Sequence, residues 1–170
     1  ILAFGIEWGS EKVRTANAKV FSQEKIKEIL GKVRAAGMYD LDNFIIGLPD
    51  EDEETVKETL RLATELNPFF INFFAAMAYP GSPLYEEALR ENWELPPSWS
   101  AYAQHSYDSF PLRSKHLTNA QVLKARDNTW KAYFERPEYM EMMVRQFGPQ
   151  AKEEVEKMTS VKLKRKLLGD

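Results

Sequence analysis

Three stretches of the sequence place polar or turn-forming residues at the end of an apolar run. The stretches are LAFGIEWGSEKV from Leu2, FIIGLPDEDEETV from Phe44 and FFAAMAYPGSPLYEEA from Phe73. Each passes from a strand-like segment through a turn containing Gly or Pro into the start of a helix, as parallel βα units do when they present ligand-binding loops. The pattern indicates a small-molecule site built from hydrogen-bonding groups at strand ends.

The segments between these stretches alternate between strand and helix patterns. Ser22 can cap a helix in which Ile26 and Leu30 lie on the apolar face, and Gly37 is placed to end it. The acidic run 50–54 opens a second helix, where it complements the helix dipole. This alternation predicts an α/β fold whose parallel strands are joined by right-handed crossovers.

The second half of the sequence has a different character. Residues 91–115 show no sustained period, which is typical of a functional segment or of one draped over a core. Thr118 and Gln121 then form a capping-box signature, and Pro137 starts a further helix. We expect an α-helical C-terminal segment whose last helix ends in the basic sequence LKRKLL (163–168), where positive charges would offset the helix dipole.

The composition excludes several classes of function. The 23 basic and 26 acidic side chains are interspersed and give a net charge of −3, so we do not expect nucleic-acid binding. The apolar runs are much shorter than the roughly 20 residues that a membrane span needs. With no cysteine and two histidines, the chain has neither disulfides nor a metal site of its own. Because no signal peptide precedes the first apolar run, we expect a truncated cytoplasmic protein.

The three stretches also resemble a known family. GIEWGSEKV resembles the GIESGSE segment of the radical S-adenosylmethionine barrel, FIIGLPDEDEET its fifth-strand segment, and AYPGSPLYEEA the turn after its sixth strand. The likeness is strongest to members that carry an upstream cobalamin-binding domain. The motifs follow in family order over residues 1–89. The resemblance implies the C-terminal half of a partial (β/α) barrel over residues 1–90, followed by an irregular linker and a helical extension over residues 91–170.

The resemblance gives three residues of the first segment a role. Glu7 would lie at a strand end and face the ribose or the polar end of S-adenosylmethionine, and Ser10 could hydrogen-bond or cap a helix. Lys19 resembles the family's basic residue, which meets the cofactor carboxylate by a charge-assisted hydrogen bond. The alternative interpretation makes Glu7 a partner of a helix dipole and Lys19 a solvated loop cation.

The second segment resembles the family's G-x-I-x-G-x-x-E pattern, whose backbone groups bracket the adenine. Asn43, Ile45, Gly47 and Asp50 occupy the four places, so the first Gly and the final Glu are replaced. Asn43 still offers a donor and an acceptor to a ribose hydroxyl, and Ile45 can pack against a purine. The alternative is a plain βα turn with a helix cap. Tyr79 either shapes the edge of the cofactor or substrate site or only stops the third strand.

The function implied by the resemblance belongs to a larger enzyme. That enzyme would cleave S-adenosylmethionine reductively at a four-iron, four-sulfur cluster and start radical chemistry or methyl transfer, with cobalamin as a further candidate cofactor. Cluster ligands are absent from this chain, so we expect it to be inactive alone and to need the N-terminal half of the same polypeptide. The alternative is a non-catalytic βα module with a helical protein-interaction tail. Exposed apolar edges would favour self-association in either case, and no substrate can be named.

Overall fold

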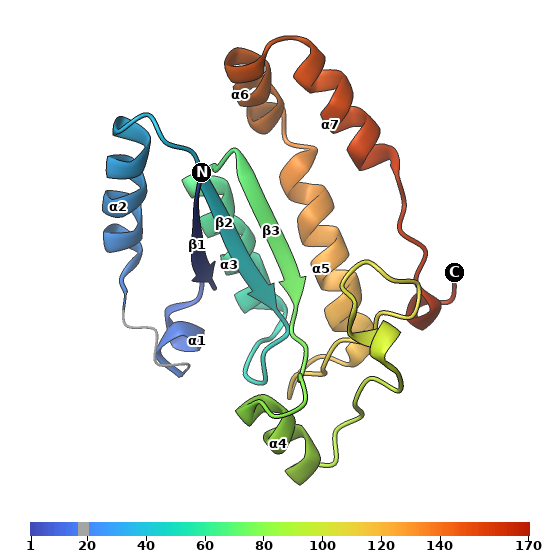
Figure 1. Ribbon diagram of the computed structural model, residues 1–170. Coiled ribbons are helices and arrows are strands. Elements are labelled where there is room, and N and C mark those ends of the chain that lie inside the picture. The colour runs from blue at the N-terminus through green and yellow to red at the C-terminus, as the bar shows by residue number, and fades with distance from the viewer. Residues whose placement is uncertain (17–20) are drawn as a thin grey trace.

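The computed structural model describes residues 1–16 and 21–170 and confirms the expected α/β class. Three strands, β1 (Leu2–Glu7), β2 (Asp40–Ile46) and β3 (Phe70–Ala75), form a parallel sheet in the order β1-β2-β3 (Figure 1). Parallel strands place their C-terminal ends at one edge of the sheet, where the loops that follow them converge. The three motifs therefore lie at the same edge of the sheet.

Helices separate the strands and make up most of the second half. They are α1 (Glu11–Ala16), α2 (Gln23–Ala35), α3 (Glu53–Leu66), α4 (Pro83–Arg90), α5 (Asn119–Phe134), α6 (Pro137–Phe147) and α7 (Gln150–Ser160), with short 3₁₀ turns η1 (Trp99–Tyr102) and η2 (Lys166–Leu168).

Four helices, α2, α3, α4 and α5, begin where the sequence supplies a capping side chain. The Ser22 hydroxyl accepts a hydrogen bond from the Lys25 backbone at the start of α2. Asp52 forms a capping box with Thr55 in α3, and Thr118 forms one with Gln121 in α5. Each cap satisfies backbone N–H groups that the first helical turn leaves without partners, which is worth about 1 kcal/mol. The expected helix starts are confirmed.

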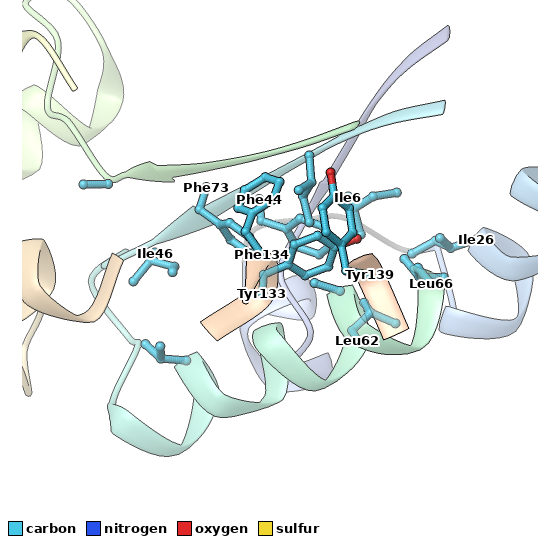
Figure 2. Packing of buried hydrophobic residues seen from close by; sticks show 14 of the residues in the cluster. Ile6, Ile26, Phe44, Ile46, Leu62, Leu66, Phe73, Tyr133, Phe134 and Tyr139 are labelled. Atoms are coloured by element: carbon cyan, nitrogen blue, oxygen red, sulfur yellow. The ribbon is translucent and has the colours of Figure 1, made fainter. Parts of the chain in front are cut away.

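One face of the sheet packs against helices and forms the main core. Phe44, Ile46 and Phe73 point from β2 and β3 toward α3 and α5, where Tyr133 and Leu62 meet them (Figure 2). The Phe44 and Phe73 rings stack with centroids 5.6 Å apart. Because Tyr133 and Phe134 of α5 belong to the same cluster as Phe44, the C-terminal helices pack directly on the sheet.

The opposite face of the sheet is only half-buried. Along β2 and β3, buried and half-exposed residues alternate strictly. The half-exposed residues on these two strands are Leu41, Asn43, Ile45, Phe70, Asn72 and Phe74. We call this surface the open face. Parallel sheets are usually covered on both sides, so a half-exposed face in one is unusual.

Side chains occupy the outer edge of β3. The Arg126 Nε donates to the Phe73 carbonyl at 2.7 Å. The Gln104 amide bonds the Ala75 backbone twice, accepting from its N–H and donating to its carbonyl at 2.9 Å each. Gln104 lies in the irregular segment after α4, which therefore drapes over the sheet edge as its lack of periodicity indicated.

The C-terminal end differs from the sequence-based expectation. The last α-helix, α7, ends at Ser160, so the basic sequence 163–168 lies beyond it, partly in the short 3₁₀ turn η2, and does not offset the dipole of an α-helix. Arg165 is instead fully buried, with its guanidinium bonded to the Asp127 carboxylate and to the carbonyls of Gln104 and Ser106. A buried charge needs such partners, and helical periodicity cannot reveal them. Across the described ranges, no helix has the length and apolar character to span a bilayer.

Candidate functional site

A row of polar groups crosses the middle of the open face. Gly5, Asn43 and Asn72 are register partners on β1, β2 and β3. The Asn72 amide donates to the Asn43 Oδ1 at 2.9 Å, and the Asn43 amide donates to the Phe4 carbonyl at 3.3 Å. Each amide carries two donor hydrogens and two acceptor lone pairs, so these bonds leave capacity for a ligand hydroxyl or heteroatom.

Apolar side chains lie next to this row, toward the C-terminal ends of the strands. Ile45 and Phe74 are register partners, both half-exposed on the open face. Ile45 packs against a cluster formed by Trp8, Val13, Leu48 and Ala76. A polar row beside an apolar shelf suits a ligand that has a hydrogen-bonding part and a flat apolar part.

Glu7 ends β1 with an unusual backbone conformation. Its φ is +72°, and the register with β2 shifts between Gly5 and Glu7. A positive φ is uncommon for a residue with a side chain and costs on the order of 1 kcal/mol, and such strain collects at binding sites. The half-exposed Glu7 side chain follows Ile6, which belongs to the main core.

Two of the sequence-predicted residues, Ser10 and Gly47, are buried. Ser10 is 4% exposed, immediately before α1. Gly47 is buried with φ +99°, and a Cβ added there would lie 2.2 Å from the Val122 Cγ1 of α5. Gly9 makes a similar close approach, since its Cβ would lie 2.2 Å from the Glu58 carbonyl oxygen of α3. The need for glycine at 9 therefore comes from the close approach of α3, whereas at 47 the positive φ and the close approach of α5 both disfavour a side chain.

Glu51 closes the turn after β2, a role that the sequence did not single out. Its Oε2 accepts from the backbone N–H groups of Gly47 at 2.7 Å and Leu48 at 2.9 Å. Burial raises the pKa of Glu51 to about 7, although the two backbone bonds act in the opposite direction. Within the described residues its Oε1 has no partner. A protonated carboxyl fits this environment, because a buried charge without a cation is costly.

One of the remaining two predicted residues lies apart from the polar row, and the other lies outside the described residues. Tyr79 is 51% exposed and stacks on Tyr102 of η1, with ring centroids 5.6 Å apart. Tyr79 therefore belongs to an aromatic surface in the loop region after β3, which Trp99 extends. Lys19 lies outside the described residues. The open face thus brings together Asn43 and Ile45, which are two residues apart on β2. Glu7 lies at the end of the neighbouring strand, β1.

Asn72 is the site residue that sequence reasoning missed. It lies in the apolar run FINFF, where an amide between aromatic residues is unexpected in a strand buried on both sides. An amide within an otherwise apolar strand is the sequence signal that could have identified Asn72. Over the residues that the structure describes, no cluster of three or more metal-ligating side chains occurs.

Comparison with known proteins adds two relatives, while no family model matches the chain. The chain is 29% identical over 137 residues to an uncharacterized methyltransferase of Pyrococcus horikoshii, a match covering 81% of this chain and 29% of the relative. It is 27% identical over 133 residues to the anaerobic magnesium-protoporphyrin IX monomethyl ester cyclase of Cereibacter sphaeroides, covering 76% of this chain and 21% of that protein. The chain spans less than a third of either relative, and both relatives are named as enzymes.

Proposed function

We propose that this chain is part of a radical S-adenosylmethionine enzyme and that its open face binds part of S-adenosylmethionine. The observation that carries the proposal is the row of Gly5, Asn43 and Asn72 across a sheet face that is half-exposed. The names of the two relatives, a methyltransferase and a cyclase, agree with this family. The activity itself belongs to the longer polypeptide.

The side chains on the open face suit the parts of this cofactor. Asn43 and Asn72 offer donors and acceptors for the ribose hydroxyls, and Ile45 with Phe74 offers an apolar surface for the adenine. Glu7, at the end of β1, can accept hydrogen bonds from the ammonium group or the ribose. We assign Lys19 to the cofactor carboxylate on the resemblance alone. Ser10, Gly47 and Tyr79 are assigned the support and the outer edge of the site.

The iron–sulfur cluster must be held by other residues of the polypeptide. Thiolates are the usual cluster ligands, and this chain contains no cysteine. With a reduced cluster elsewhere in the polypeptide, S-adenosylmethionine held at this site would supply either reductive cleavage for radical chemistry or its methyl group for transfer. This chain would position the nucleoside and exclude water from it. Any use of cobalamin is assigned to the missing N-terminal part.

The test uses the longer polypeptide that contains this chain and an upstream CxxxCxxC. After anaerobic reconstitution we expect 5′-deoxyadenosine to form from S-adenosylmethionine. Asn43→Leu and Glu7→Gln should each lower the rate about tenfold or more, because each removes a polar contact worth about 1–3 kcal/mol. Glu86→Gln, an exposed carboxylate on α4, is the matched control and should keep the rate.

The variants also separate the two proposed functions. Cluster absorbance must be equal in all proteins, so that a lost rate reports on the open face and not on cluster assembly. Unchanged rates in both Asn43→Leu and Glu7→Gln would remove the open face from the site and favour a non-catalytic βα module. The isolated chain should bind S-adenosylmethionine weakly in calorimetry, and submicromolar binding would contradict a divided site.

A further inference from the structure

A cavity lies away from the open face, between α5, the end of α7 and the C-terminal segment 161–170. Its volume is about 850 Å³, within the range of small-molecule sites, roughly 300–1,000 Å³. The apolar lining comes from Trp130, Met158, Val161, Leu163 and Leu168. Four of these side chains, all except Trp130, are more than a third exposed. Burial of these exposed apolar side chains against a flat apolar ligand would lower the free energy.

The charged side chains that line this cavity are mostly positive. Lys124, Arg126, Lys131 and Lys162 face two carboxylates, Asp127 and Asp170. Both carboxylates already have partners within the chain. Asp127 bonds the buried Arg165 through two contacts of 3.0 Å, and Asp170 pairs with Lys162 and accepts from the Arg165 backbone. Asp127 also pairs with Arg126 of the same lining. The four cations still exceed the two carboxylates by two charges (4 − 2), and this excess favours an anion.

Arg126 gives the cavity a fixed cationic group. The residue is 4% exposed, and its Nε and Nη1 are held by the Phe73 carbonyl and by Asp127, both at 2.7 Å. A guanidinium held by two bonds loses little side-chain freedom when a ligand arrives. His105 also lines the cavity, and its pKa is lowered by partial desolvation and by the nearby Arg126 and Arg165 charges. A neutral imidazole there can donate and accept hydrogen bonds.

We propose that this cavity binds a small organic anion with a flat apolar body. The anionic group, a carboxylate, sulfonate or phosphate, pairs with the basic side chains of α5, and the apolar body packs against Trp130 and the C-terminal segment. The site is independent of the open face, because α5 and residues 158–170 supply nearly all of its lining. Its existence therefore does not rest on the proposed enzymatic function.

The experiment titrates the 170-residue chain with 8-anilinonaphthalene-1-sulfonate, a fluorescent anion of this class. We expect saturable binding and energy transfer from Trp130 to the probe. The chain has three other tryptophans that can also transfer energy, so Trp130→Phe should lower the total transfer without abolishing it and should leave the fold intact. Lys124→Glu combined with Lys131→Glu should raise Kd about tenfold, because reversing two exposed charges changes the binding free energy by roughly 1–2 kcal/mol.

The matched control reverses two exposed lysines outside the cavity. Lys57 and Lys152 are paired with Glu54 and Glu156, as Lys131 is with Glu135. The double variant Lys57→Glu/Lys152→Glu carries the same net charge as the cavity variant and should change Kd by about twofold or less. The uncharged probe N-phenyl-1-naphthylamine should bind the wild-type chain and the cavity variant equally, which separates the anionic contact from the apolar one.

Three outcomes would overturn the proposal. Equal loss of sulfonate binding in the cavity and control variants would show a general charge effect. Unchanged sulfonate binding in the cavity variant, or energy transfer that Trp130→Phe leaves unchanged, would place the probe elsewhere, for example on the open face. Urea unfolding of every variant establishes that the compared proteins are folded.

Discussion

The covered and open faces of the sheet are built from the same three strands but carry different kinds of side chain. On the covered face Phe44 and Phe73 stack beneath α3 and α5, with Ile46 fully buried beside them. On the open face two asparagines bond each other in register, flanked by half-exposed apolar residues. Since neighbouring residues of a strand point to opposite faces, one residue step separates the two environments.

This contrast indicates a division of labour within each strand. The covered face supplies most of the burial that stabilises the fold, because burial of apolar area is the main favourable term. The open face keeps polar groups that a packed core would have to satisfy at a cost. Substitutions at adjacent positions should therefore separate stability from ligand binding.

The largest effect is expected for Phe44→Ala on the covered face. Phe44 is fully buried, so its truncation should lower the free energy of unfolding by about 3–5 kcal/mol. Ile45→Ala, one residue along on the open face, is the control and should cost about 1 kcal/mol. Urea unfolding followed by circular dichroism measures both. Similar losses in the two variants would mean that the open face is as tightly packed as the covered one.

Gly47→Ala tests where β2 meets α5. We expect a loss of about 2–4 kcal/mol, because φ is +99° and the new Cβ would lie 2.2 Å from Val122. Val122→Ala should cost less in this variant than in the wild-type chain, with a coupling of about 1 kcal/mol in a double-mutant cycle. Additive losses would show that backbone strain, and not the approach of α5, requires glycine at this position.

Asp42 offers a pH test of the covered face. Burial raises its pKa to about 7 from 3.8, and neither carboxylate oxygen has a partner among the described residues. A raised pKa means that the folded state holds the proton more tightly. Its contribution to stability is therefore complete below about pH 4 and is lost as the pH rises through 7.

Asp42→Asn should remove this loss. The variant should match the wild-type chain near pH 4.5 and exceed its free energy of unfolding by about 3 kcal/mol near pH 8, since each pKa unit is worth about 1.4 kcal/mol. Comparing the two proteins at each pH cancels the contributions of other groups, such as the raised pKa of Glu51. A constant difference between the two proteins across this range would contradict a buried, protonated Asp42.

The smallest change in stability is expected for Asn72→Leu on the open face. Its amide bond to Asn43 is half-exposed, so the free energy of unfolding should change by about 0.5–1 kcal/mol. Thermal unfolding in parallel with Phe44→Ala gives the comparison. A loss of several kcal/mol would make the asparagine pair a structural element of the sheet.

The sequence supported the element types because the decisive signals are local. Ser22, Asp52 and Thr118 cap helices through side chains within three residues, and the apolar periodicity identifies the buried stripe of α2. Parallel pairing followed from the alternation of strands and helices. The prediction failed at the C-terminal end, where α7 ends at Ser160 and Arg165, beyond it, bonds Asp127 of α5.

The candidate site was harder to predict because its residues acquire their roles through contacts between distant parts of the chain. Glu51 looked like one more charge in an acidic run, but tertiary packing buries it under the turn of Gly47. The role of Asn72 depends on its hydrogen bond to Asn43 on the neighbouring strand. Asn43 and Ile45 were identified, and the structure places both on the open face. Their contact with a cofactor stays a prediction, as do the roles of Glu7, Ser10, Lys19, Gly47 and Tyr79.

The Gln104 amide has a consequence for how the sheet can be enlarged. By bonding both backbone groups of Ala75, the side chain imitates the next strand, and Arg126 occupies the Phe73 carbonyl nearby. An incoming strand at this border would have to displace both side chains. The β3 edge is therefore disfavoured for additional strands, whether they come from the same polypeptide or from another molecule.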